Sequence, residues 1–174
     1  MTKPDIKDNL LTHHQNFIAI IQNLTEQEFL LSINEKWSAG QQLDHIYRSV
    51  KPLVLAFALP KLLLATFFGK ANRLSKNYAQ LVEKYTAKLA SGYKASAKYS
   101  PGPIALSQRD KLAKKLSGLI NKLNKKIDSF DERDLDRYIL PHPLLGKLTI
   151  REMLFFTVYH VQHHQSLILK TLNK

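Results

Sequence analysis

Cysteine is absent from this chain of 174 residues, and acidic side chains are scarce. The absence of cysteine excludes disulfide bonds, thiolate metal ligands and cysteine nucleophiles, so any metal ion must be held by nitrogen and oxygen atoms. It also fits a cytoplasmic protein, as does a polar first segment without the apolar core of a signal peptide. The length suits one domain with a substantial core, and we expect a single domain over residues 1–174.

A long uninterrupted apolar run is missing as well. The longest apolar stretch, residues 52–68, contains Pro60 and Lys61 and is shorter than the roughly 20 apolar residues that span a bilayer. We therefore expect a buried helix here and no membrane partner.

The shortage of acidic residues leaves a net charge of +12, because 26 lysines and arginines face 14 aspartates and glutamates. Such an excess is one signature of proteins that bind nucleic acid or anionic membranes. The lysines, however, concentrate between residues 70 and 126, away from the segments whose histidines are described below. A basic stretch without a recognition motif is typical of a solvated helix face. The sequence therefore allows nucleic acid as a partner but does not favour it.

What is present is helical periodicity. Apolar residues recur at helical spacing in four long segments, which cover residues 6–24, 38 to at least 51, 107–130 and 149–172. Helix starts are marked by capping boxes, in which a serine or threonine is followed three residues later by glutamate or glutamine. These boxes are Thr25 with Glu28, Ser38 with Gln41, and Thr149 with Glu152. The pattern predicts an all-α protein, and four long helices joined by loops describe a four-helix bundle.

The connections between these helices carry turn signals. Pro52 and Pro60 are expected to kink or break the second long helix, because proline removes a backbone donor and clashes with the preceding turn. Residues 69–106 form a basic excursion between the second and third long helices, with both helical and loop signals. A loop containing Pro141, His142 and Gly146 is expected before the last helix, and no alternating strand pattern competes with the helices.

The most informative local feature is the histidine cluster of the last helix. His160 and His164 are four residues apart, so they lie one turn above each other and can aim two ring nitrogens at one point. A metal site normally takes a third protein ligand and keeps one position for water. The best candidate is His45, the only histidine in another apolar helical run. His163 is a second choice to His164, because residues three apart are also neighbours on a helix.

Other residues are weaker candidates. Gln41 and Ser49 lie one turn on either side of His45 and could hydrogen-bond a water or a substrate, and Arg48 could receive an anionic substrate. Each is also typical of a solvated helix surface. The three remaining histidines lie in polar or proline-flanked contexts, and we interpret them as surface residues. They are His13, His14 and His142.

Three motifs together resemble the DinB-like (DinB and YfiT-like) superfamily. Residues 37–46 look like the start of its second helix, residues 148–153 like the entry to its fourth, and residues 160–164 like its closing histidine motif. The resemblance implies a four-helix bundle with a three-histidine metal site, whose ligands are His45, His160 and His164. The chain departs from the family at Leu167, where glutamine is common, and in the length of the excursion over residues 69–106.

The resemblance also implies a function. Characterised members of this group include thiol transferases and metal-dependent isomerases or hydrolases, so we expect a divalent-metal-dependent enzyme that transfers a thiol to a small substrate or hydrolyses one. Zinc and nickel both suit imidazole ligands. A homodimer and a small-molecule substrate, such as a thiol, are the expected partners. The alternative is a non-enzymatic stress-response or binding protein that uses its basic surface.

Overall fold

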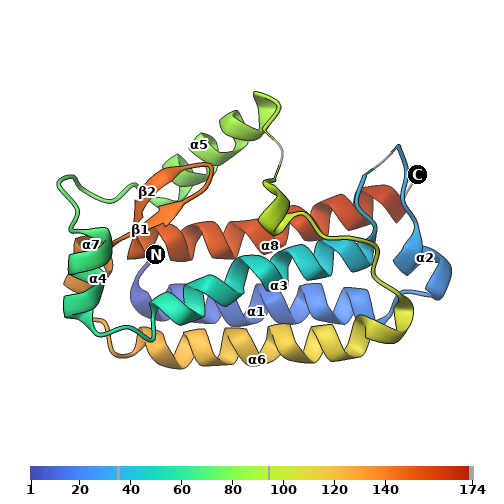
Figure 1. Ribbon diagram of the computed structural model, residues 1–174, viewed down its shortest axis with the longest axis horizontal. Coiled ribbons are helices and arrows are strands. Elements are labelled where there is room, and N and C mark those ends of the chain that lie inside the picture. Colours follow the sequence, from blue (N-terminus) through green and yellow to red (C-terminus); the bar gives the residue numbers. More distant parts are fainter. Residues whose placement is uncertain (35, 94, 173–174) are drawn as a thin grey trace.

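Helices dominate the computed structural model, which describes residues 1–34, 36–93 and 95–172 (Figure 1). In the described residues the α-helices are α1 (Lys3–Gln22), α2 (Glu26–Leu30), α3 (Ala39–Ala56), α4 (Lys61–Phe68), α5 (Tyr78–Ala90), α6 (Arg109–Ile127), α7 (Glu132–Arg137) and α8 (Ile150–Leu172). Two 3₁₀ turns, η1 (Ala97–Tyr99) and η2 (Leu106–Gln108), and a small hairpin of β1 (Ile139–His142) and β2 (Gly146–Thr149) complete them. The all-α class is confirmed.

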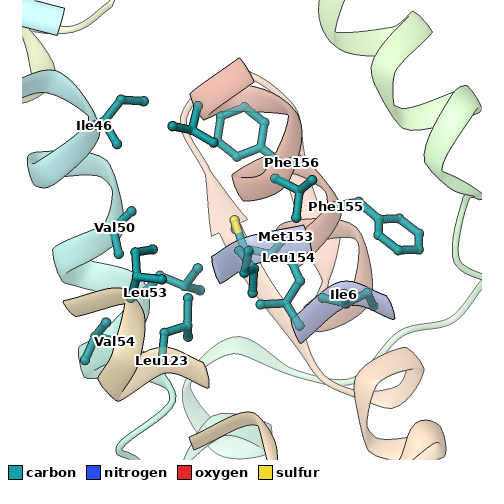
Figure 2. Close-up of a cluster of buried hydrophobic side chains, with 14 of the residues drawn as sticks. Ile6, Ile46, Val50, Leu53, Val54, Leu123, Met153, Leu154, Phe155 and Phe156 are labelled. Atoms are coloured by element: carbon teal, nitrogen blue, oxygen red, sulfur yellow. The ribbon is translucent and has the colours of Figure 1, made fainter. Parts of the chain in front are cut away.

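The core lies between the four longest helices, α1, α3, α6 and α8, which run side by side (Figure 1). Helix α6 packs on α1 and α3, and α8 packs on the same two helices from another side. Figure 2 shows apolar side chains from all four helices pointing toward one another, among them Ile6, Val50, Leu123 and Leu154. Each such side chain contributes about 1.5–3 kcal/mol when it is removed from water, so this cluster holds the helices in register.

The predicted capping boxes all form. At the start of α3, for example, the Ser38 hydroxyl accepts the backbone N–H of Gln41, and the Gln41 side chain accepts the backbone N–H of Ser38. A further box, Thr2 with Asp5, begins α1 three residues before the predicted start. The caps satisfy amide groups that a helix leaves unpaired at its N-terminus, and they fix where each helix begins.

The two prolines of the apolar stretch act differently. Helix α3 continues through Pro52 and ends at Ala56, whereas Pro60 directly precedes α4. The chain bends by 112° between α3 and α4. In the part of the chain that the structure describes, no single helix is long and apolar enough to cross a membrane, and only α3 and α4 taken together would pass by length and composition.

The predicted loop before the last helix is instead a hairpin, and this part of the sequence interpretation was wrong. Strands β1 and β2 pair antiparallel over four residues each, with Leu140 opposite Leu148 and Pro141 opposite Lys147. A strand of four residues is too short for an alternation of apolar and polar residues to be recognised in the sequence. A sheet of two strands consists of edges, which is where proline is tolerated. Gly146 begins β2 with a φ of +77°, a backbone conformation that favours glycine.

The basic excursion is tied to the start of α8 by a buried carboxylate. Glu152 is fully buried, and both of its oxygens accept hydrogen bonds from the Arg73 guanidinium, at 2.6 and 2.7 Å. The backbone N–H groups of Lys76 and Thr149 donate to the same carboxylate. Burial alone would raise the pKa of Glu152, but these donors outweigh it and lower the pKa to about 2. The excursion is therefore anchored to the bundle by a charge pair rather than by apolar contacts alone.

We predict that Arg73→Met lowers the free energy of unfolding by about 3 kcal/mol, because it removes the bidentate cation of a buried carboxylate and leaves the Lys76 ammonium, 3.7 Å away, in its place. The measurement is chemical denaturation at neutral pH. Arg109→Met is the control, since Arg109 pairs with the exposed carboxylate of Asp110 and donates one hydrogen bond to the carbonyl of Leu24, and it should cost about 1 kcal/mol. Adding Glu152→Gln to Arg73→Met should recover part of the loss. Equal costs for the two arginine variants would contradict the assignment.

Candidate metal centre

Two helices bring three imidazole rings together in the core. Helix α3 carries His45, and α8 carries His160 and His164 one turn apart. The Nε2 atom of His160 lies 3.1 Å from Nε2 of His45 and 3.0 Å from Nε2 of His164. All three side chains are buried, and together they form a group that could hold a metal ion. The structure thus brings together the three histidines that the sequence analysis singled out.

Hydrogen bonds at Nδ1, on the side of each ring away from the point where the Nε2 atoms meet, determine the tautomers of His45 and His164. Nδ1 of His45 lies 2.7 Å from the carbonyl oxygen of Tyr99, which can only accept, so this nitrogen carries the proton. Nδ1 of His164 donates in the same way to the side-chain oxygen of Gln42. The orientation of that amide is fixed, because its NH₂ group donates to the carbonyl of Trp37. In the neutral rings of His45 and His164, Nε2 therefore keeps its lone pair.

This donor set fits a divalent ion. The Nε2 lone pairs of His45 and His164 converge on Nε2 of His160. A neutral His160 ring has one N–H group, so without a cation the three rings could form at most one hydrogen bond among themselves. A tetrahedral ion with bonds of about 2.1 Å holds its ligand atoms about 3.4 Å apart, close to the 3.1 and 3.0 Å that separate Nε2 of His160 from Nε2 of His45 and of His164. Burial, followed by repulsion from the neighbouring imidazoles, lowers the pKa of His160 and of His164 well below the usual range. The rings are thus neutral, the form that binds metal.

The three histidines open onto a cavity of about 490 Å³. Much of its wall is apolar, with contributions from α3, α5, α8 and the hairpin. Among the apolar residues of the wall are Val50, Leu53, Leu89, Leu140, Met153 and Phe156. Polar side chains line the cavity as well, among them Ser49, Thr157 and Lys98. The cavity is large enough for a small molecule and combines an apolar surface with a limited set of polar groups.

The weaker candidates of the sequence analysis fall into different places. Ser49 lines the cavity, and its hydroxyl donates to the backbone carbonyl of His45. Gln41 instead caps α3 and donates to the carbonyl of Pro101. Arg48 pairs with Asp44 at 2.6 Å. Among the described residues, neither Gln41 nor Arg48 belongs to the cavity wall.

His163 is half-buried and lines the cavity, but it does not belong to the converged group. Its ring packs against the rings of Tyr85 and Tyr159. This position agrees with its interpretation as a neighbour of the site.

Two histidines that the sequence analysis placed on the surface are in fact inside, so that interpretation was wrong. His14 is 1% exposed and His142 is mostly covered, and both line the cavity. For His14 a signal existed, because it continues the helical spacing of Leu10 and Phe17 on the buried face of α1. Its polar sequence neighbours concealed this. For His142 the flanking prolines concealed a strand.

His14 is buried with one nitrogen unsatisfied. Nδ1 donates to the carbonyl of Leu10 at 2.8 Å, and Nε2 is sealed from solvent without a hydrogen-bond partner among the described residues. Burial lowers the pKa of His14 to about 4. The ring is therefore neutral at physiological pH.

Comparison with known proteins agrees with the site. The sequence model of the DinB superfamily matches residues 9–168. This chain belongs to the DinB superfamily. Members of the superfamily generally bind metal, and the three-histidine group lies within the matched region. No curated protein and no solved structure matches the chain.

The hydrogen bond from His164 to Gln42 gives a first prediction for the site. Gln42→Leu should lower metal affinity about 10- to 100-fold, because the ring of His164 loses the partner that orients it. Affinity is measured by competition with a chromogenic chelator. Gln162→Leu is the control, since Gln162 lies on α8 beside the ligands and its amide donates to Tyr78 instead. A similar loss in both variants would count against a specific role for Gln42.

The lowered pKa of His14 gives a second prediction. The unfolded chain takes up this proton near pH 6.5 and the folded chain only near pH 4, so stability falls as the pH drops through this window. Between pH 6.5 and 4 the free energy of unfolding of His14→Leu should therefore fall less than that of the parent protein, by roughly 3 kcal/mol. Denaturant unfolding across this range measures it. His13→Leu, one residue away and half-exposed, should change the pH dependence much less.

Proposed function

We propose that this protein is a divalent-metal-dependent enzyme that acts on a small, mainly apolar substrate, by thiol transfer to it or by its hydrolysis. One observation carries the proposal: three buried Nε2 atoms, at least two with their lone pairs free, converge on one point beside a cavity of substrate size. The ligands are His45, His160 and His164, as the sequence analysis expected. Zinc and nickel remain the two preferred ions, because imidazole suits both.

The reaction class follows from the donor set. Three neutral imidazoles add no negative charge, so a divalent ion held there keeps its full charge and acts as a Lewis acid that lowers the pKa of a water or a thiol. The residues of the chain would have two roles. His45, His160 and His164 would hold the ion in place, and the apolar part of the wall would keep bulk water away from the reacting group.

Outside the proposed ligands, the cavity wall carries further imidazoles, those of His14, His142 and His163. Among the described residues no aspartate or glutamate lines it. Tyr85 lines it next to His160, but burial raises the pKa of its phenol far above the usual value, so the phenol stays protonated. The lack of a carboxylate in the described part of the wall supports a reaction whose nucleophile is activated by the ion, and it leaves imidazoles of the wall, such as His163, as the side chains that could accept a proton.

The ligand assignment is tested by comparing His164→Ala with His163→Ala. The first should lose most of its metal, because two imidazoles remain for the ion. The second should keep its metal, because His163 stands outside the converged group. Metal content is measured on both proteins after the same chelator challenge, with His45→Ala and His160→Ala beside them. Equal retention in the two variants, or a greater loss in His163→Ala, would overturn the assignment.

The reaction is tested separately, on protein loaded with zinc or with nickel. Hydrolysis of small aromatic esters and conjugation of small thiols to aromatic electrophiles are followed in the parent protein, in His160→Ala and after metal removal. Turnover that requires both the ion and His160 supports the enzyme. Tight metal binding without turnover of either class would favour the non-enzymatic alternative.

A further inference from the structure

His142 lies at the end of β1 and closes the turn of the hairpin with its ring. The backbone N–H groups of Leu144 and Leu145 both donate to its Nδ1, at 3.1 and 3.0 Å. Lys84 of α5 holds the same turn from outside, because its ammonium group donates to the carbonyl of Leu145. The ring is therefore fixed by the hairpin itself and by the helix that covers it.

These contacts determine which nitrogen of His142 carries the proton. A backbone amide can only donate, so Nδ1 must offer its lone pair to both N–H groups. Burial, together with the nearby charge of Lys84, lowers the pKa of His142 to about 4, and the ring is neutral. A neutral imidazole with a bare Nδ1 carries its proton on Nε2.

The Nε2–H group is the one that the hairpin turn leaves free, on a residue that lines the cavity. His142 is part of the cavity wall, and its ring packs on Phe156, whose other contacts include the ring of the proposed ligand His160, 4.6 Å away between centroids. Within residues 1–34, 36–93 and 95–172, Nε2 of His142 has no hydrogen-bond partner, and it is not one of the polar atoms sealed from solvent. One phenyl ring thus separates the metal centre from an unused donor.

Two neighbouring hydroxyl groups are already engaged. Ser49 donates its proton to the carbonyl of His45, and Thr157 donates to the carbonyl of Met153, so both present lone pairs to the cavity. A hydrogen-bond donor in a mainly apolar wall selects for an acceptor on the ligand, because an unpaired polar group there is costly.

We propose that the Nε2–H of His142 donates a hydrogen bond to an uncharged acceptor oxygen, such as a carbonyl, of the small apolar substrate. The ring of Phe156, which lies between His142 and His160, sets the distance between this oxygen and the reacting group of the substrate. This inference rests on the proposed function for the position of the substrate. His142 is then a specificity-determining residue of the same site, and it takes no part in holding the ion.

The tautomer is tested first, because it depends on neither metal nor substrate. Long-range ¹H–¹⁵N NMR spectra of the ¹⁵N-histidine-labelled protein distinguish a protonated from a bare ring nitrogen, and the spectrum of His142→Asn assigns the signals of His142. We expect a bare Nδ1 and a protonated Nε2. A proton on Nδ1 would overturn the proposal.

Binding is tested with two probes of the same shape, acetophenone and α-methylstyrene, which differ in that only the first has an acceptor oxygen. The metal-loaded parent protein should prefer acetophenone about fivefold, the value of one neutral hydrogen bond. In His142→Asn the side-chain oxygen can still accept the two amides of the turn, but no ring N–H reaches the cavity. This variant should fold, keep its metal and lose the preference.

The controls separate this inference from the proposed function. Unfolding midpoint and metal content of His142→Asn, measured beside the parent protein, show whether the turn and the ion are intact. A preference that persists in His142→Asn would place the oxygen on the ion or on another donor of the wall, such as the Tyr85 hydroxyl or the Lys98 ammonium, and would overturn the inference while leaving the metal site standing. Failure of the parent protein to bind metal would defeat the proposed function, whereas the tautomer and the acetophenone preference, then measured on the metal-free protein, would still decide the role of His142.

Discussion

Buried imidazoles are the constraint around which this structure is organised. An imidazole removed from water must have its polar atoms satisfied, and three of them side by side repel one another if they are charged. In His45 and His164 the Nδ1 atom is satisfied by an oxygen acceptor. This acceptor is the Tyr99 carbonyl of the η1 turn for His45 and the Gln42 side chain for His164. The fold leaves Nε2 of both rings facing inward. The arrangement therefore has a polar outer side that the protein satisfies and an inner side that a cation satisfies.

This constraint explains why the segments outside the four long helices matter. The carbonyl that orients His45 belongs to Tyr99, far along the chain in the basic excursion, and the excursion is anchored to α8 through Arg73 and Glu152. Helix α5 packs on α8 through Tyr78 and Tyr85, which meet Phe155 and Phe156. The excursion is thus one wall of the cavity as well as the source of a hydrogen bond to His45, so under the proposed function its position would affect the ion and the substrate together.

Local patterns in the sequence were enough to predict the four long helices and the pair His160 and His164, and together with the family resemblance they selected His45, but they did not reveal the residues that support these histidines. Helical spacing and capping boxes act over three or four residues, and the pair His160 and His164 has the same range. Gln42 and Tyr99 contact the ligands only through the tertiary fold, so nothing near them in the sequence marks them. His14 shows a different failure: its spacing on α1 was informative, and the polarity of its neighbours was given too much weight. The hairpin was too short to show a period.

The proposed metal ligands and the proposed substrate-binding donor of the cavity lie on different elements of the fold. The proposed ligands sit on α3 and α8, whose apolar faces are locked into the core, and their spacing cannot change without repacking it. His142 sits on a two-stranded hairpin held by a turn, by Lys84 and by contacts to α4 and α8. Substitutions in the hairpin or in α5 can move the donor relative to Phe156 while the histidine group stays in place. Under the proposed function, such a site would change the substrates it accepts through the hairpin and α5 and would keep its metal chemistry through α3 and α8.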